Sequence, residues 1–514
     1  MKKSTKKGIQ IIVAALTLLL AVYTALHFIV KIKVEKMLKV EVAKSFEIQY
    51  KDLGLNLISG NVSLSMLQVK SIDTVLWVNP LKINRLEIKG VNYFELFRSG
   101  NFKMNSVLLD AVKGDFVKKD SNNVAKSATK DFKKVVSIKK LILKNSYFTQ
   151  IDAKNDSVLK EFKNLNVHIE GFKLDSTSLA SKIPIAYEAF HINSGPIHVN
   201  ISPFENLKID SVYTDGKLII LGFQLASKYD KVALQSKLTK ERDFIDLQIP
   251  TIEIDNFQFM GLEDSILLSI TAVELHKLNL EMYRNKLLAD DYEVKELFYK
   301  KIGNLPFKID IGNVAIKNGE IRYTELVNKV SKAGEIYFTA LNSTIENISN
   351  LNGSPIIFKN KANLMGVAPI NLAWTFRENS NENLFLVEGT VMNFDTKEIN
   401  SFMMSNLRAK SSGTIQELYF TFSGNAYSST GDIKMKYEDF KFQVLKKDRS
   451  GVNDVLTFIG NIFTNDGSNT NDRGYRFGTI ETERDNTKSF FNYIWKNVND
   501  GLVSTLTGNG EKEK

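Results

Sequence analysis

The sequence of 514 residues contains no cysteine, only eight prolines and only five histidines. The absence of cysteine excludes disulfide bonds, thiol nucleophiles, iron–sulfur clusters and cysteine-ligated zinc. It does not indicate a redox compartment, because a chain without cysteine is compatible with any of them. With 43% apolar and 25% charged residues, the composition is that of a folded protein and excludes wholesale disorder.

The signatures of common catalytic and nucleotide-binding sites are missing as well. The sequence has no GxSxG, no GxxxxGK[ST], no GxGxxG after a strand and no HExxH. His191 and His198 stand seven residues apart, and no carboxylate accompanies them at the spacing of a metal site. We therefore expect no enzyme activity, no cofactor and no metal site. A hydrolase with an unrecognised site is the remaining catalytic alternative.

The net charge of +10 is concentrated at the N-terminus. Residues 1–44 contain nine lysines and two acids, which leaves a charge of only +3 for the rest of the chain. A protein that neutralises phosphates keeps its positive charge on the folded domain. The charge distribution therefore excludes nucleic acid as a partner.

Residues 9–30 read IQIIVAALTLLLAVYTALHFIV, without a single Lys, Arg, Asp or Glu. A helix of this length extends about 33 Å, which is enough to cross a hydrocarbon core of ~30 Å. A cleaved signal peptide is the alternative, but its apolar core is shorter, roughly 7–15 residues, and ends at a small-x-small site. The sequence predicts a membrane anchor over residues 9–30, with Ile9, Leu18, Leu19, Leu20 and Val30 facing lipid.

The flanks of this span suggest its orientation. Lysines occur on both sides, but a tail of eight residues stays where it was made, and a long domain is exported. We expect residues 1–8 to be a cytoplasmic tail and residues 31–49 to be a juxtamembrane segment outside it.

Residues 50–445 alternate apolar and polar side chains in short runs separated by Asn, Asp, Gly and Ser, which predicts β-strands nearly throughout. One pattern recurs: apolar-x-apolar-x-x-apolar-x-apolar-x, followed by Gly or Asn. The copies begin 55, 71, 40 and 62 residues apart, so a solenoid of fixed period is not indicated. They start at Leu81, Val136, Leu207, Leu247 and Ile309 and end at Gly90, Asn145, Gly216, Asn256 and Asn318.

The odd step in the middle of the pattern would flip the face of a regular strand, so we expect a bulge there that returns the side chains to one face. This predicts a long, curved antiparallel sheet with an apolar groove. Two packed sheets with an ordinary dry core are the alternative. The expected groove lining is Ile83, Ile88, Ile138, Leu143, Ile252, Ile254, Ile309, Ile311 and Ile316.

Residues 446–514 lose the alternation, and we expect them to form a C-terminal helical segment. Apolar residues recur at helical spacing from Val452 to Phe463. A second amphipathic helix carries Phe490, Ile494, Trp495, Val498 and Leu502. Such helices can cap the end of a sheet or lie on a membrane surface. The few lysines on the polar face favour capping.

This layout resembles the AsmA-like proteins of Gram-negative envelopes. The local similarities lie in residues 316–323 (IKNGEIRY), 334–350 (GEIYFTALNSTIENISN), 431–440 (GDIKMKYEDF) and 484–501 (RDNTKSFFNYIWKNVNDG). The resemblance implies an inner-membrane protein with its bulk in the periplasm. It also implies that phospholipid, or another acyl-chain lipid, is guided along a hydrophobic β-groove to maintain the outer membrane, with an outer-membrane or envelope protein as a partner. The alternative is a periplasmic scaffold that binds envelope proteins by strand addition during outer-membrane assembly.

Overall fold

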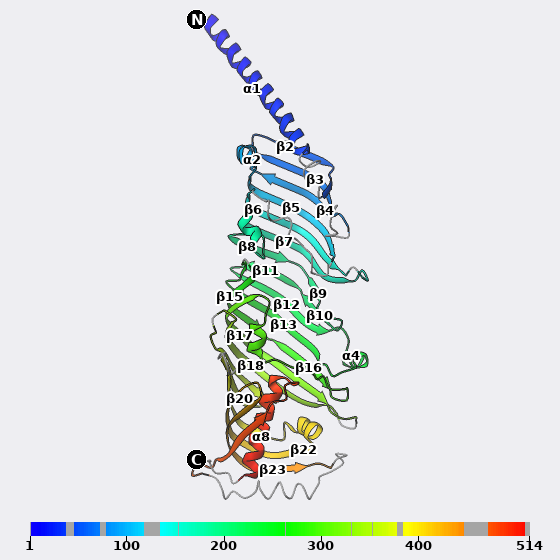
Figure 1. Ribbon diagram of the computed structural model, residues 1–514, viewed down its shortest axis with the longest axis vertical. Helices are drawn as coiled ribbons and strands as arrows, with labels where there is room; N and C mark the ends of the chain where they lie inside the picture. The colour runs from blue at the N-terminus through cyan, green and yellow to red at the C-terminus, as the bar shows by residue number, and fades with distance from the viewer. Residues whose placement is uncertain are drawn as a thin grey trace. The chain divides into compact units, whose positions relative to one another are not determined.

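The chain folds mainly as β-sheet. The computed structural model describes residues 2–36, 46–71, 79–117, 134–152, 154–262, 264–329, 332–351, 353–377, 384–446 and 471–508. Strand accounts for 59% and helix for 16%, which confirms the predicted mainly-β class. The chain divides into two compact units, whose elements can be followed in Figure 1.

Unit 1 comprises Met1–Asn200, Ser211–Thr214 and Gly261–Asp264. Its helices are α1 (Lys2–Lys36), α2 (Tyr93–Ser99) and α3 (Ser176–Ala180). Its strands are β1 (Phe46–Gln49), β2 (Asp52–Asn56), β3 (Asn61–Ser71), β4 (Leu81–Lys89), β5 (Phe102–Val117), β6 (Val136–Ile151), β7 (Val158–Leu174), β8 (Ala189–Ser194), β9 (Ile197–Asn200) and most of β11 (Ser211–Asp215).

Unit 2 comprises Ile201–Asp210, Asp215–Met260 and Ser265–Lys514. Its strands are β10 (Glu205–Ile209), β12 (Lys217–Ser227), β13 (Phe244–Asp255), most of β14 (Gln258–Gly261), β15 (Ile266–His276), β16 (Asn279–Asn285), β17 (Lys308–Leu326), β18 (Gly334–Ser349), β19 (Ile356–Leu364), β20 (Ala368–Arg377), β21 (Leu384–Asp395), β22 (Ala409–Gly424), β23 (Ser428–Val444) and β24 (Arg476–Glu483). Its helical segments are α4 (Lys231–Lys237), α5 (Phe298–Gly303), α6 (Asn400–Phe402), the π-helical turn η3 (Met403–Leu407) and α8 (Phe490–Thr507).

The expectation of an antiparallel sheet is wrong for three strand pairs, so the sheet of each unit is mixed. In unit 1, β5 runs parallel to β6; in unit 2, β15 and β16 run parallel to β17. Parallel neighbours need a long crossover connection instead of a hairpin. In unit 2 that crossover is the stretch of residues 286–307, which contains α5. Such a connection has no alternation of its own, so the strand pattern could not reveal the parallel pairing.

The two ends of the chain are helical where they are described. α1 contains the whole predicted span of residues 9–30. No helix in the described part of the chain is both long and apolar enough to cross a membrane. At the other end, α8 corresponds to the second predicted C-terminal helix. The first predicted helix, over residues 452–463, lies outside the described residues.

The repeated pattern places its apolar residues on one face of the sheet. In β4, Ile83 and Leu86 belong to the same apolar cluster, whereas Asn84 and Arg85 between them are exposed. The expected bulge is nevertheless wrong, because the register continues without a shift through this pair. Another feature of the backbone returns the apolar side chains of this strand to one face.

This feature is a residue with left-handed backbone conformation on the neighbouring strand. Asn84 faces Met66 on one side and Ala111 on the other, with φ of 51° and 52°, and both ladders skip it. A left-handed residue bends its strand and interrupts the alternation of side chains without adding a residue to either strand. The other copies repeat this arrangement, with Lys139 facing Gly171, Asp210 and Pro250 facing Gly222, and Gly312 facing Asn347.

The Gly or Asn that ends each copy of the pattern is also left-handed, and at Asn145 and Asn318 the register of the ladder shifts. All five adopt positive φ, between 49° and 67°, a region in which glycine is unstrained and asparagine is the commonest other residue. In β6 and β17 the kink is also hydrogen-bonded across the pair. The N–H of Asn145 donates to Oδ1 of Asn166 over 3.0 Å, and that of Asn318 donates to Oδ1 of Asn342 over 3.2 Å.

These kinks reveal an internal duplication. Module A (β3, β4, β5, β6 and β7) and module B (β12, β13, β15 with β16, β17 and β18) share the same strand order and the same pattern of parallel and antiparallel pairs. Aligned by register, their left-handed residues coincide. The pairs are Met66 and Gly222, Gly90 and Asn256, Ala111 and Lys277, Asn145 and Asn318, Asn164 and Ala340, and Gly171 and Asn347.

The duplication explains the irregular spacing of the sequence pattern. The copies at Leu81 and Val136 belong to module A, and their counterparts in module B start at Leu247 and Ile309. The copy at Leu207 lies in β10, which precedes module B. The repeating unit is therefore a five-strand module that contains two copies.

The kinks generate a stability prediction. Asn318→Val places a β-branched residue at a φ of 52° and should cost about 1–3 kcal/mol of unfolding free energy. Asn318→Gly should stay within about 0.5 kcal/mol of the native chain, because glycine accepts this φ. The measurement is urea denaturation followed by circular dichroism.

Lys317→Val is the matched control, since it places the same side chain one residue earlier, at ordinary strand φ. Equal losses for Asn318→Val and Lys317→Val would contradict a role of the left-handed conformation.

Candidate functional site: two equivalent apolar faces

Module A carries one compact apolar face, which we call cluster A. Its buried members, which come from β3, β4 and β5, are Leu64, Leu67, Ile83 and Val112. Partly buried neighbours complete it, among them Leu81, Leu86, Leu109, Leu143 and Phe148. These nine side chains lie on the same face of the sheet, because the left-handed residues return the apolar side chains of each strand to that face.

Module B carries the matching face, cluster B. Aligned by register, each of the nine residues named above has an apolar counterpart that belongs to cluster B. In the same order the counterparts are Ile220, Phe223, Ile249, Leu278, Leu247, Ile252, Leu275, Ile316 and Ile321. Leucine is replaced by isoleucine or phenylalanine, but never by a polar residue. The two modules therefore present the same apolar surface, and no helix in the described part of the chain contributes to it.

The predicted lining residues divide between these clusters and their margins. Ile83 and Leu143 belong to cluster A, and Ile252, Ile254, Ile311 and Ile316 belong to cluster B. Ile138 and Ile309 are buried and Ile88 is half-buried, outside both clusters. Sequence reasoning missed Leu64, Leu67, Val112, Leu278 and Phe148. Four of them lie on strands whose alternation is broken by a left-handed residue, and Leu278 directly follows the left-handed Lys277 between β15 and β16. A search for strict period two could therefore not group them.

The anchor residues lie on α1. Leu18, Leu19 and Leu20 are 67%, 65% and 61% exposed, whereas Val30 is buried. Ile9 lies in the part of the helix whose side chains are not described. The structure thus places bulky apolar side chains of this helix in contact with solvent, which is costly in water.

The apolar face at the C-terminal end of unit 2 is covered by a helix. Ile494 and Tyr493 of α8 are buried in a large cluster with strands β19 to β24, and Phe490, Trp495, Val498 and Leu502 pack against it. Figure 1 shows α8, in red, lying against these strands. Gly501 permits the close approach, because a Cβ there would lie 2.8 Å from Ile480. The predicted apolar stripe of this helix therefore caps a sheet.

α8 also covers the backbone of the edge strand β24. Backbone N–H groups of Thr479 and Glu481 donate to the side chains of Ser504 and Asp500 over 2.9 and 2.8 Å. Lys496 donates to the carbonyl of Glu483 over 2.8 Å. An edge strand normally offers such groups to an added strand. At β24 they are already occupied.

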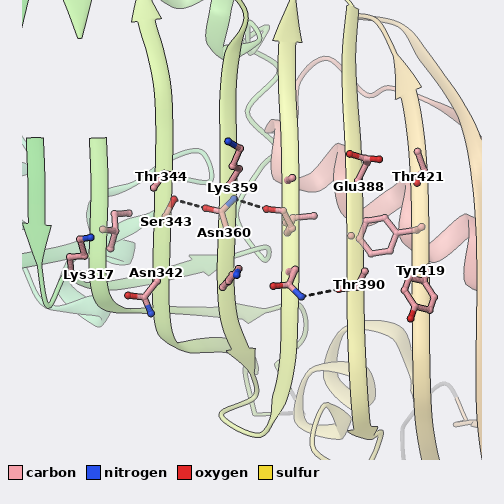
Figure 2. A pocket seen from close by; sticks show the side chains of 17 residues that line it. Lys317, Asn342, Ser343, Thr344, Lys359, Asn360, Glu388, Thr390, Tyr419 and Thr421 are labelled. Atoms are coloured by element: carbon pink, nitrogen blue, oxygen red, sulfur yellow. Dashed lines mark hydrogen bonds between the residues drawn. The ribbon is translucent and has the colours of Figure 1, made fainter. Parts of the chain in front are cut away.

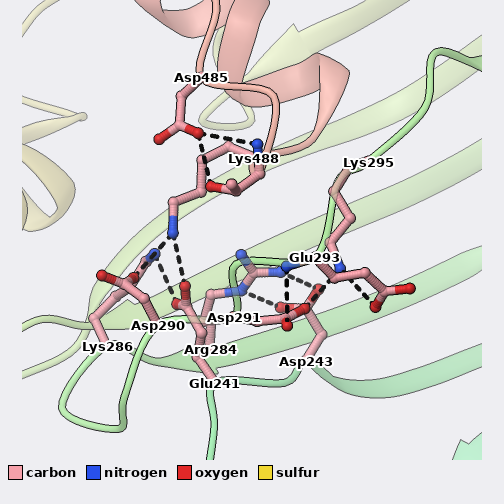
Figure 3. A network of polar contacts seen from close by, with 11 residues as sticks. Glu241, Asp243, Arg284, Lys286, Asp290, Asp291, Glu293, Lys295, Asp485 and Lys488 are labelled. Atoms are coloured by element: carbon pink, nitrogen blue, oxygen red, sulfur yellow. Dashed lines mark hydrogen bonds and ion pairs between the residues drawn. The ribbon is translucent and has the colours of Figure 1, made fainter.

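A network of ion pairs holds the start of α8 in place (Figure 3). The carboxylate of Glu241 is buried, and its oxygens lie 2.8 Å from Lys488 and 2.7 Å from Lys286. Lys488 also pairs with Asp290 over 2.9 Å. Burial alone would raise the pKa of Glu241, but the two lysines outweigh it and lower the pKa to about 2. Residues far apart in sequence are thus joined at the base of α8.

A cavity of about 830 Å³ is lined by residues of β17 to β22 (Figure 2). Its polar side chains bond to one another: Ser343 donates to Asn360 over 2.7 Å, and Asn360 donates to the carbonyl of Leu372 over 2.8 Å. The ring of Phe420 lies over Gly389, where any Cβ would collide with it. Among the described residues, no group of three or more His, Asp or Glu could hold a metal ion.

No family model matches the chain, and no curated protein matches it.

The network at Glu241 generates a pH prediction. Its native pKa of about 2 lies below the ordinary value of 4.5, so its contribution to stability is complete above pH 4.5 and is lost as the pH falls toward 2. Amides of α8 should therefore lose hydrogen-exchange protection across this window, after correction for intrinsic rates. Glu241→Gln should already weaken protection at pH 7, by about 1–3 kcal/mol.

Glu293→Gln is the control, because the Glu293 side chain is 78% exposed and pairs only weakly with Lys295. If the amides of α8 are protected from hydrogen exchange equally well in the Glu241→Gln and Glu293→Gln variants at pH 7, the network does not hold the helix.

Proposed function

We propose that this chain is a membrane-anchored lipid carrier of the AsmA-like type, in which clusters A and B each receive acyl chains. In this proposal α1 anchors the chain in the inner membrane with residues 1–8 in the cytoplasm, and both units lie in the periplasm. The cargo is a phospholipid or another acyl-chain lipid, and the role is to supply or maintain the outer membrane. The chain performs no covalent chemistry.

The observation that carries this proposal is the equivalence of nine positions that clusters A and B share. Nine positions in module A and their nine counterparts in module B are all apolar, although the two modules differ in most other residues. Nine equivalent apolar positions would also be compatible with two ordinary dry cores. A dry core needs a second layer, however, and in the described part of the chain no helix side chain belongs to either cluster. A sheet face of this kind suits a ligand that is apolar, extended and chemically uniform.

The energetics of lipid movement fit such a surface. Withdrawing a chain of sixteen carbons into water costs on the order of 12 kcal/mol, at ~0.8 kcal/mol per methylene. An apolar face removes most of this barrier while the head group stays in water. It must bind weakly, because a tight site would trap the lipid. Repeated, modest apolar clusters meet that requirement better than one deep pocket.

The anchor is supported by α1 itself. The helix contains the uncharged run of residues 9–30, and its described leucines are exposed. A bilayer would cover these side chains. The lysines that flank the run on both sides match the interfacial positions of a membrane helix.

Transfer of fluorescent phospholipid between vesicles tests the proposal. Ile254→Asp places a charge within cluster B and should slow transfer by the full-length, reconstituted chain at least about tenfold, because a charge on an apolar path costs more than the ~1.4 kcal/mol that corresponds to tenfold.

Gln248→Asp is the matched control. It adds the same charge at an exposed position of the same strand and should transfer lipid at the native rate. Native transfer by a folded Ile254→Asp variant would refute the proposal.

A further inference from the structure

We infer that unit 1 carries a membrane-contact surface of its own, formed by the turn between β2 and β3 together with α2, which rests on the anionic bilayer that holds α1. This inference depends on the anchor in the proposed function, and it adds a second point of contact. We call the surface the footing and define it by Ile58, Phe94, Arg98 and Lys134.

The apolar part of the footing is presented on rigid backbone. Ile58 is 84% exposed, and Phe94 is 68% exposed. The side chain of Asn56 accepts the N–H groups of Ile58 and Ser59 over 3.1 Å, which holds Ile58 at the tip of a tight turn. Phe94 lies in the first turn of α2, whose N-cap is Asn92. A bulky apolar side chain held outward by its own turn is unfavourable in water and favourable in a membrane interface.

The turn and α2 belong to one surface. The N–H of Val91, just before α2, donates to the carbonyl of Gly60 over 2.8 Å. A Cβ at Gly60 would lie 2.8 Å from Val91, so only glycine allows this approach. Ile58 and Phe94 therefore project from the same edge of the unit 1 sheet.

Positive charge surrounds these apolar groups. Arg98 is exposed and stacks over the ring of Phe94 at 5.7 Å. Lys134 is exposed, and its side chain reaches the C-cap of α2 at Gly100. Glu95 is the acid of this helix, and its charge is offset by Lys103 at 3.3 Å. Aromatic and aliphatic tips framed by Arg and Lys match the interface of a bilayer that contains anionic lipid.

The position of α1 indicates that the footing contacts the bilayer and not another protein. α1 contacts β2, the strand that leads directly into the turn of Ile58. Val30, at the end of the predicted span, is buried. Lys36 is the last residue of α1, and the sequence that follows adds Lys39 and Lys44. The footing thus belongs to the unit whose first strands meet the anchor.

The absence of cysteine makes the test direct, because a single introduced cysteine takes an NBD fluorophore at one site only. Ile58→Cys and Phe94→Cys are labelled in the full-length chain, which is reconstituted in vesicles with and without anionic lipid. Ser157→Cys, in the exposed turn between β6 and β7 at the opposite edge of the sheet, is the matched control.

We expect blue-shifted NBD emission at positions 58 and 94 in anionic vesicles, quenched by lipids that carry a nitroxide roughly 5–10 Å below the surface. The label at position 157 should stay water-like and unquenched. Charge reversal by Arg98→Glu with Lys134→Glu should abolish the quenching at position 94.

Alkali-resistant flotation of the same vesicles measures the anchor separately. A chain that floats but keeps water-like labels at positions 58 and 94 overturns the footing and leaves the proposed function intact. A chain that does not float overturns the anchor, and the footing with it. A blue shift in vesicles that is not quenched by the nitroxide lipids indicates a protein contact and also overturns the footing.

Discussion

The architecture depends on one constraint of β-geometry: side chains alternate, so two apolar residues separated by an odd step point to opposite faces of a regular strand. This chain contains such steps throughout its repeated pattern. A left-handed residue on the neighbouring strand resolves each step, as Met66 and Ala111 do for Asn84. Because neither strand gains a residue, the register is kept and the apolar face continues across many strands. Without these kinks, clusters A and B would be divided between two faces.

The duplication follows naturally from this constraint. In each module of five strands, left-handed residues at the same six positions keep the apolar side chains on one face of the sheet. The second module preserves these positions while most side chains change. Asparagine or glycine was retained where the backbone demands it, and Ala111 and Lys277 show that other residues accept the cost when the surrounding ladder holds them.

The C-terminal end is organised differently, because polar contacts decide it. α8 buries an apolar stripe, yet its place is set by the ion pairs of Lys488 with Glu241 and Asp290, and by side chains that bond the edge of β24. Buried and half-buried charges of this kind add specificity more than stability. They define where the helix lies on the sheet, and side chains of α8 occupy the backbone N–H groups of positions 479 and 481 that another strand would use.

The sequence by itself determined the mainly β class, the apolar run inside α1, the helix of residues 490–507 and the common face of residues such as Ile83 and Leu86. These are local properties, since alternation, helical periodicity and left-handed preference act over a few residues. Only the tertiary structure decided the parallel pairing of β5 with β6, the unshifted register at the odd steps of the pattern and the equivalence of the modules. The same holds for the joining of Glu241 to Lys488. Each of these depends on which distant strand or loop lies beside a residue, and no short-range pattern encodes that choice. The membrane anchor and the lipid cargo are proposals that rest on the sequence pattern and on the two apolar faces together.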